Sequence, residues 1–498
     1  MATGSPPGAS LRRRATRGVA WSLAQSLGSR LLTATTFVIL ARLLNPYVFG
    51  VVAFASVAIS VLTLFVQQGL GQALVQVPKL ESRHSDTAFW VSLAFAVVLA
   101  LGTVGISWPL AAAIDQPAVG EVLRVLSIGF LLSGLSSTPQ ALLQRRMAFR
   151  SLAARQLLSN TVGALTGITL ALSGAGVWSL VAQTLTTAAV GVVVLWPAAR
   201  WRPGRHASWA TYREMFSFSA NVTGTTLMGF LNRRADDLFI GAVLGPTSLG
   251  AYSVAYRLLT LLTEVSINTV SSVALPTFAR IQHDLHRIRS AYTAATRLSA
   301  AIALPVFSFM AVAAPEIVIV FFGQQWVNSI DVMRVLALLG VANTLTNFNG
   351  ALLTAIGRPN LVFRFMATGA IVNVAAIALV VQHGILAVAA VVVARNWVVS
   401  SPLSIYYLTR SIGMSLGDYL RPYLTPLAAA AALVGCAAVI HVRTAQALDP
   451  GARLALMAGA SGVAYAVVLW VFDRPLVREF LTTVRVVIGR SGAASFPV

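Results

Sequence analysis

Apolar stretches of about 20 residues follow one another along nearly the whole chain, separated by short polar connections. A helix needs about that length to cross the ~30 Å hydrocarbon core of a bilayer. The alternating pattern of a membrane β-barrel is absent, so we expect helices, which satisfy their own backbone hydrogen bonds in lipid. The pattern predicts about fourteen transmembrane helices, at residues 18–41, 47–68, 87–108, 121–143, 153–172, 176–197, 215–243, 250–272, 293–322, 331–355, 362–381, 385–408, 422–442 and 453–472.

Four stretches depart from this simple pattern. The predicted spans 215–243 and 293–322 are longer than a bilayer requires, so we expect a tilt, a break or an extra turn in each. In 279–292 and 474–490, apolar residues recur at helical spacing between arginines. Basic amphipathic helices favour an anionic membrane surface, so both stretches are candidate interfacial helices.

Composition supports the same class of protein. Hydrophobic residues make up 57% of the 498 positions and charged residues only 10%, whereas roughly a quarter of a soluble protein is charged. We therefore expect an all-α integral membrane protein that is no enzyme and has no soluble catalytic domain. The single cysteine, Cys436, lies in an apolar segment, so we expect neither a disulfide framework nor a metal or other cofactor.

The formal net charge of +21 has two interpretations, nucleic-acid binding or membrane topology. The basic residues gather in every second connection, whereas connections 173–175 and 244–249 carry no charge. This alternation indicates the positive-inside rule, with both termini in the cytoplasm and an even number of spans. The sequence therefore predicts a multi-pass protein of the bacterial cytoplasmic membrane with no nucleic-acid partner.

The two halves of the chain resemble each other at an offset of about 200 residues, which indicates an internal repeat. Leu44-Asn45-Pro46-x-x-Phe49-Gly50 matches Leu244-Gly245-Pro246-x-x-Leu249-Gly250, and Arg124-Val125-Leu126 matches Arg334-Val335-Leu336. Two bundles of six spans, both entering the membrane in the same direction, are typical of parallel-repeat transporters. The predicted regions are a basic cytoplasmic tail (1–17), the two bundles (18–200 and 215–410) joined by a basic cytoplasmic linker (201–214), transmembrane helices 13 and 14 (411–472), and a cytoplasmic tail with a candidate interfacial helix (473–498).

Several motifs, in this order, also carry a family resemblance over residues 15–410. They are Leu40-Ala41-Arg42-Leu43-Leu44-Asn45-Pro46, Gln144-Arg145 with Phe149-Arg150, Gly174-x-Gly176-Val177-Trp178-Ser179-Leu180-Val181, Arg233-x-x-Asp236 with Leu249-Gly250-x-Tyr252, and Leu275-Pro276-x-Phe278-x-Arg280-Ile281-Gln282. The chain resembles the polysaccharide-transport branch of the multidrug/oligosaccharidyl-lipid/polysaccharide exporter superfamily, and most of all its colanic-acid-exporter type of Wzx flippase. Asn45 stands where that family leads us to expect Thr, and Asp237 where it leads us to expect Asn.

The resemblance implies both a fold and an activity. The fold would be a V-shaped pair of six-helix bundles around a central cavity. The activity would be movement of a polyprenyl-pyrophosphate-linked oligosaccharide from the cytoplasmic to the outer leaflet by alternating access, for cell-envelope or exopolysaccharide synthesis. The implied partners are this glycolipid, membrane lipids, a coupling cation or proton, and polysaccharide-assembly proteins.

Ionisable residues at membrane depth are costly, so they usually face a wet cavity or a partner. Arg30, Arg257 and Arg395 have no carboxylate close in sequence, and we expect them to bind the substrate pyrophosphate together. Arginine suits this role because its fixed fork of donors grips phosphate with two bonds. The neutral polar residues that could line the same space are Gln25, Asn160, Asn221, Asn268, Asn343, Asn347, Asn349 and Asn373.

Span 215–243 holds a second group, Arg233, Arg234, Asp236 and Asp237. The two arginines are candidate substrate contacts, but their spacing also allows each to pair with a carboxylate three or four residues on. Asp236, Asp237 and Glu264 are candidates for coupling to a cation or proton, although Glu264 can equally pack against Arg257. Arg124 and Arg334 begin equivalent spans and could snorkel to the interface instead of binding substrate.

Three other functions remain open from sequence. A cation-coupled multidrug antiporter of the same superfamily would be expected to carry an acidic site in its first bundle, where this chain has Arg30. A polysaccharide polymerase or glycosyltransferase needs a substantial outer loop, but the outer connections here are short and nearly uncharged. A scaffold within a cell-envelope assembly is the third.

Overall fold

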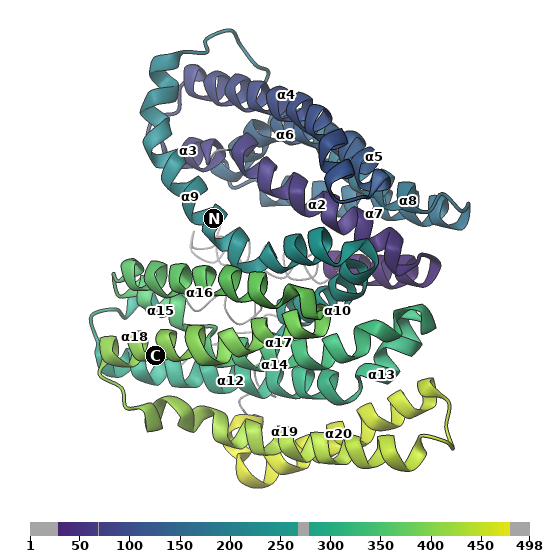
Figure 1. The fold of residues 1–498 in the computed structure, drawn as a ribbon. Coiled ribbons are helices and arrows are strands. Elements are labelled where there is room, and N and C mark those ends of the chain that lie inside the picture. The colour runs from purple at the N-terminus through teal and green to yellow at the C-terminus, as the bar shows by residue number, and fades with distance from the viewer. Residues whose placement is uncertain (1–27, 68, 267–277, 479–498) are drawn as a thin grey trace, which may run out of the picture. The chain divides into compact units, whose positions relative to one another are not determined.

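The computed structural model describes residues 28–67, 69–266 and 278–478, and in this part of the chain all regular secondary structure is helical. The predicted all-α class is therefore confirmed (Figure 1). Ten of the described helices are long and apolar enough to cross a membrane. The protein is thus a multi-pass membrane protein.

Fourteen spans remain a prediction. The first predicted span lies partly outside the described residues, although 28–43 is helical. The helices α7 (Phe149–Leu172), α9 (Trp209–Val243) and α10 (Gly245–Ser266) correspond to three further predicted spans and contain 24, 35 and 22 residues. These three helices are not among the ten, and α9 holds Arg233, Arg234, Asp236 and Asp237.

The chain divides into two compact units. The first is Met1–Phe230 with Gly245–Gly250, and the second is Leu231–Leu244 with Ala251–Val498, so the division falls within α9 and α10. The remaining helices of the first unit are α2 (Pro46–Gln67), α3 (Leu70–Gln76), α4 (Ser82–Ala113), α5 (Pro117–Leu126), α6 (Ile128–Arg145) and α8 (Val177–Ala199). Within this unit α7 packs along α8, and α6 packs against both α4 and α8 (Figure 1).

The predicted linker is fixed to the first unit at its start. Asp86, buried in the first turns of α4, accepts hydrogen bonds from the backbone nitrogens of Gly204 (3.0 Å) and His206 (3.4 Å). The indole nitrogen of Trp90, one turn further along α4, donates to the carbonyl of Gly204 at 2.9 Å. The linker therefore does not run free through its whole length, and α9 begins at Trp209.

The two copies of the repeated Pro-x-x-x-Gly motif meet each other inside the first unit. A Cβ atom added to Gly50 would overlap the carbonyl oxygen of Pro246, and one added to Gly250 would overlap the carbonyl oxygen of Pro46. Each motif thus supplies a glycine to the other motif's proline. Only residues without side chains allow the backbones to approach this closely.

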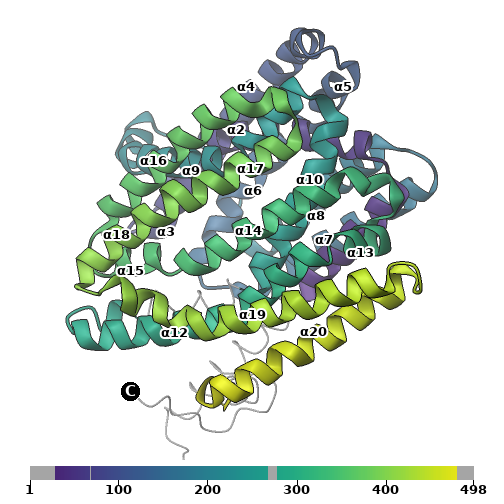
Figure 2. The ribbon, with the colours of Figure 1, turned by 60° about the horizontal axis from the view of Figure 1, so that its bottom comes forward.

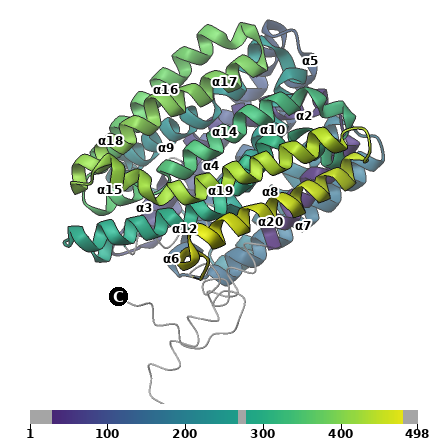
Figure 3. The ribbon, with the colours of Figure 1, turned by 90° about the horizontal axis from the view of Figure 1, so that it is seen from below.

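The second unit is built around α12, which contacts both α14 and α19, while α20 runs beside α19 (Figures 2 and 3). Its elements after α10 are α12 (Leu285–Val312), α13 (Ala314–Ile317), a π-helical turn (Val318–Phe322), a 3-10 turn (Gln324–Ser329), α14 (Ile330–Thr346), α15 (Asn349–Ala355), α16 (Pro359–Val380), a 3-10 turn (Val381–His383), α17 (Ile385–Arg395), a π-helical turn (Asn396–Ser400), α18 (Ser401–Ile412), α19 (Leu416–Thr444) and α20 (Pro450–Phe472).

The expected irregularity of the long spans is confirmed for 293–322. There α12 ends at Val312, Pro315 lies in the short α13, and a π-helical turn follows. The predicted interfacial helix over 279–292 is wrong, because turns occupy 281–283 and its second half is the start of α12. The Asp284 side chain caps that start by accepting from the backbone nitrogens of His286 and Arg287, both at 3.0 Å. Of 474–490, residues 474–478 are helical and 479–490 lie outside the described residues.

Helix α19 is hydrogen-bonded to the chain at the break between α14 and α15. The hydroxyls of Tyr419 and Tyr423, one turn apart on α19, both donate to the carbonyl of Leu345, at 2.7 and 2.8 Å. Asn349, fully buried at the start of α15, accepts from Tyr292 of α12 at 2.6 Å. The break therefore exposes no unpaired backbone group at Leu345, and α19 and α12 are both bonded to it.

Candidate functional site

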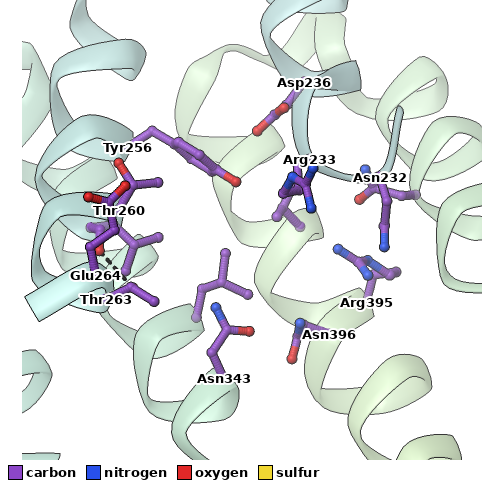
Figure 4. Close-up of a pocket in the computed structure, with 14 residues that line it drawn as sticks. Asn232, Arg233, Asp236, Tyr256, Thr260, Thr263, Glu264, Asn343, Arg395 and Asn396 are labelled. Carbon is purple, nitrogen blue, oxygen red and sulfur yellow. Dashed lines mark hydrogen bonds between the residues drawn. The ribbon is translucent and has the colours of Figure 1, made fainter. Parts of the chain in front are cut away.

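A cavity of about 540 Å³ lies within the second unit, a volume typical of small-molecule sites. Six elements contribute to its wall, namely α9, α10, α14, α16, α17 and the π-helical turn after α17. Figure 4 shows the polar side chains facing this space. The lining residues are Asn232, Arg233, Asp236, Tyr256, Leu259, Thr260, Thr263, Glu264, Leu339, Asn343, Asn373, Val392, Arg395 and Asn396.

Arg395 is the most buried cation of the wall. It ends α17, only 8% of its surface is exposed, and its Nη1 donates to the Ser400 hydroxyl at 2.9 Å. Its Nε atom has no partner within the described residues. The adjoining residues Asn396–Ser400 form the π-helical turn, a feature that often occurs at functional sites. Arg395 therefore brings a guanidinium charge to the cavity wall, and its buried Nε has no acceptor among the described residues.

The four charged residues near the end of α9 lie on two sides of the helix. Arg233 and Asp236, three apart, line the cavity. Arg234 instead donates from Nη1 to Oδ2 of Asp237 at 2.7 Å, and its guanidinium lies 5.9 Å from the centre of the Tyr256 ring. The predicted pairing of Arg234 with Asp237 is thus confirmed, and it places this pair outside the cavity lining.

Asp236 has one satisfied and one unsatisfied oxygen. Its side chain is buried, and Oδ2 accepts a hydrogen bond from the Tyr252 hydroxyl at 2.5 Å. Oδ1 has no hydrogen-bond partner in the described part of the chain. Burying an unpaired carboxylate oxygen is costly, so Asp236 is suited to meet a cation, a proton or a ligand hydroxyl from the cavity.

Amides and hydroxyls complete the wall. Asn343 and Asn373 are there as the sequence suggested, whereas Asn232, Asn396 and Tyr256 were not recognised from sequence, nor were two threonines of α10, Thr260 and Thr263. A signal for the α10 residues does exist, because Tyr256, Thr260 and Thr263 recur at helical spacing on the same side as Glu264. For Asn396 no comparable signal exists, because its position depends on the π-helical turn.

Several other predicted site residues are not among those that line this cavity. Arg257 is on α10 but is not among the lining residues, and Arg30 belongs to the first unit, where it is half-buried. Asn349 takes part in the tyrosine contacts at the break between α14 and α15. Arg124 donates to the carbonyl of Gly120, and Arg334 to Asp331. Asn160 donates a hydrogen bond to Ser29, and Asn347 is absent from the lining. Gln25 and Asn268 lie outside the described residues, and the side chain of Asn221 is not described.

The chemistry of the wall is mixed. Arg233 and Arg395 are cations, Asp236 and Glu264 are carboxylates, and the amides can both donate and accept. Such a wall can bind a large polar molecule that offers anionic oxygens to the arginines and hydroxyl groups to the amides and carboxylates.

Comparison with known proteins agrees with this picture. Residues 39–331 match the family described as "Polysaccharide biosynthesis protein". The chain belongs to this family. Among the relatives of the polysaccharide biosynthesis family, the succinoglycan biosynthesis transport protein ExoT of Rhizobium meliloti is 30% identical over 485 residues, which cover 94% of this chain and 95% of ExoT.

Two solved structures share the fold of this family member. The lipid II flippase MurJ, in an inward closed conformation, matches with a TM-score of 0.69 at 13% identity, covering 91% of this chain and 99% of MurJ. An inward-facing multidrug transporter of the MATE family matches with a TM-score of 0.62 at 17% identity, covering 77% and 94%. The resemblance found in the sequence motifs is therefore confirmed.

Proposed function

We propose that this protein is a flippase for lipid-linked oligosaccharides. It moves a polyprenyl-pyrophosphate-linked glycan from the cytoplasmic to the outer leaflet of the bacterial cytoplasmic membrane by alternating access. ExoT is named as a succinoglycan biosynthesis transport protein and MurJ as a lipid II flippase, and the family concerns polysaccharide biosynthesis. These names support a transporter of a glycan that a lipid carries.

The observation that carries the proposal is the cavity of the second unit. It combines Arg233 and Arg395 with amides from four elements, Asn232, Asn343, Asn373 and Asn396. A pyrophosphate needs guanidinium donors, and a glycan needs many neutral hydrogen-bonding groups. One wall therefore offers partners for both parts of such a head group.

The test is a flipping assay with the purified protein in liposomes that contain a fluorescent polyprenyl-pyrophosphate-linked oligosaccharide. We expect Arg395→Ala and Arg233→Ala each to weaken apparent substrate affinity about tenfold to hundredfold, since each removes hydrogen bonds from a charged donor. The lysine variants should recover part of the loss, because Lys keeps the charge without the fork. Arg364→Ala, an exposed residue of α16 outside the lining, is the matched control.

Normal transport by both cavity alanine variants, at normal membrane levels, would remove these arginines from the site. Failure of the unaltered protein to move the glycolipid, together with transport of lipophilic cations, would favour a multidrug antiporter of the MATE kind. The fold shared with the MATE transporter is the observation behind this alternative.

We also propose that Asp236 and Glu264 link transport to a cation or proton. Both line the cavity, and the buried Oδ1 of Asp236 has no hydrogen-bond partner among the described residues. We expect Asp236→Asn and Glu264→Gln to retain substrate binding but to lose the dependence of flipping on an imposed proton or sodium gradient. If both variants respond to the gradients as the unaltered protein does, these carboxylates have no coupling role.

A further inference from the structure

Two side-chain hydrogen bonds span the π-helical turn at the cavity. The guanidinium of Arg395 donates to the hydroxyl of Ser400 at 2.9 Å, and the hydroxyl of Ser401 donates to Oδ1 of Asn396 at 3.0 Å. Both bonds join residues five positions apart. In an α-helix, residues five apart point about 140° away from each other. In a π-helical turn, whose hydrogen bonds run from i to i+5, they come to lie one above the other.

The two bonds fix the guanidinium of Arg395 and the amide of Asn396 at the cavity wall. The Asn396 amide oxygen is occupied by Ser401, so its nitrogen remains as a donor at the cavity wall. Arg395 uses Nη1 for Ser400, while Nε has no partner in the described residues, although only 8% of this side chain is exposed. Neighbouring residues thus present N–H groups from a charged fork and an amide.

A glycine on α16 makes this arrangement possible. A Cβ atom at Gly369 would lie 2.8 Å from the Ser400 hydroxyl and 3.4 Å from Nη1 of Arg395. Gly369 precedes Asn373, another lining residue, by one helical turn. The Arg395–Ser400 pair therefore fits against α16 only because position 369 carries no side chain.

We propose that Ser400 and Ser401 are positioning residues, which aim Arg395 and Asn396 at a phosphoryl oxygen of the substrate. This inference rests on the proposed function and assigns the pyrophosphate to one part of the cavity wall. Phosphoryl oxygen is the chemistry that matches, because the converging groups are donors and one of them is a guanidinium. Neither serine is among the lining residues, so each acts through its hydrogen bond to Arg395 or Asn396 and need not contact the ligand.

The experiment measures binding to the purified full-length protein, with inorganic pyrophosphate and a free disaccharide as separate probes. We expect Ser400→Ala to weaken pyrophosphate binding about threefold to tenfold, as loss of one orienting hydrogen bond should. Binding of the disaccharide should change little. Ser400→Thr keeps the hydroxyl and should restore pyrophosphate binding, while Gly369→Ala should imitate Ser400→Ala.

The decisive comparison is a double-mutant cycle with Arg395→Ala. In that background Ser400→Ala should have no further effect on pyrophosphate binding, because the group it positions is gone. Thr409→Ala serves as the matched control, since this hydroxyl of α18 bonds only to carbonyls of its own helix among the described residues. An undiminished effect of Ser400→Ala without Arg395 would overturn the positioning role.

Two further outcomes separate this inference from the proposed function. Weaker binding of the disaccharide, with unchanged binding of pyrophosphate, would overturn the assignment of the phosphoryl group. If Ser400→Ala weakens pyrophosphate binding only when Arg395 is present, but the protein does not flip the glycolipid, the positioning role is supported and the flippase function is overturned.

Discussion

Glu316 is a buried carboxylate of the second unit that is paired with two basic side chains. Its side chain is only 1% exposed, and Oε1 accepts hydrogen bonds from Nδ1 of His441 at 2.7 Å and from Nη1 of Arg453 at 3.2 Å. Arg453 also donates from Nη2 to the carbonyls of Ala445 and Leu448. One guanidinium therefore joins α13 to the start of α20 and to the connection that precedes it.

We predict that Arg453→Ala lowers the free energy of unfolding by about 3 kcal/mol, because it leaves a buried carboxylate with one partner fewer. Thermal unfolding of the purified protein measures the change. Arg443→Ala, which removes an exposed arginine at the end of α19, should have little effect. The double variant Glu316→Gln/Arg453→Ala should be more stable than Arg453→Ala alone. If it is less stable, the loss does not come from the unpaired charge.

For single residues, the sequence predicted which charged residues belong to the cavity region, but not which side of its helix each one occupies. From their spacing along α9, Arg233 and Arg234 were equally good candidates for substrate contact. The choice between them depends on α14, α16 and α17, which lie about a hundred or more residues further along the chain and close the cavity on one side of α9. Helical spacing reports which residues share a face, but it does not report what that face meets.

Among the elements, the short helix α3 shows how one side chain can end a helix. Nη1 of Arg145 donates to the carbonyls of Leu74 (2.8 Å) and Val77 (2.5 Å), and Nη2 donates to that of Pro78 (3.1 Å). The last carbonyls of a helix lack partners within the helix. A guanidinium from the end of α6 supplies them here.

We predict that Arg145→Lys destabilises the end of α3, since an ammonium cannot reach the same carbonyls as a planar fork. The loss should be about 1–3 kcal/mol and should appear as faster hydrogen exchange in residues 70–78. Arg150→Lys, at an exposed position of α7, is the control. Equal exchange rates in this segment for both variants would contradict the capping role.

The helices as such were readable from the sequence, whereas their interruptions were only partly so. Length alone indicated the irregularity in 293–322, and Pro315 lies within it. The break at Asn347–Phe348 contains neither proline nor glycine, although Gly350 follows it closely. Pro402 follows the π-helical turn at Asn396–Ser400 and lacks the N–H that a regular helix would bond to the carbonyl four residues before it. Hydrogen bonds from two tyrosines of α19 stabilise the first interruption, whereas the local bonds of Ser400 and Ser401, with the space left by Gly369, stabilise the second.

For the whole molecule, the alternation of basic connections makes a prediction that the helices leave open. We expect reporter domains fused after residues 115, 247, 328 and 447 to lie on the outer side, because the preceding and following connections carry the positive charge. Fusions within 201–208 and at the C-terminus should report the cytoplasm. A cytoplasmic signal from any of the four outer positions, in a stable fusion, would overturn the fourteen-span arrangement.

The contact between the two Pro-x-x-x-Gly motifs has a further consequence. Pro46 meets Gly250 and Pro246 meets Gly50, which is the reciprocity of an isologous interface, where residue i of one subunit meets residue j of the other and j meets i. Such a pattern is expected if a gene duplication joined two identical subunits that already met through this motif. The linker would then have joined covalently two subunits that had previously associated by diffusion. Both glycines would be inherited from the interface of an ancestral homodimer.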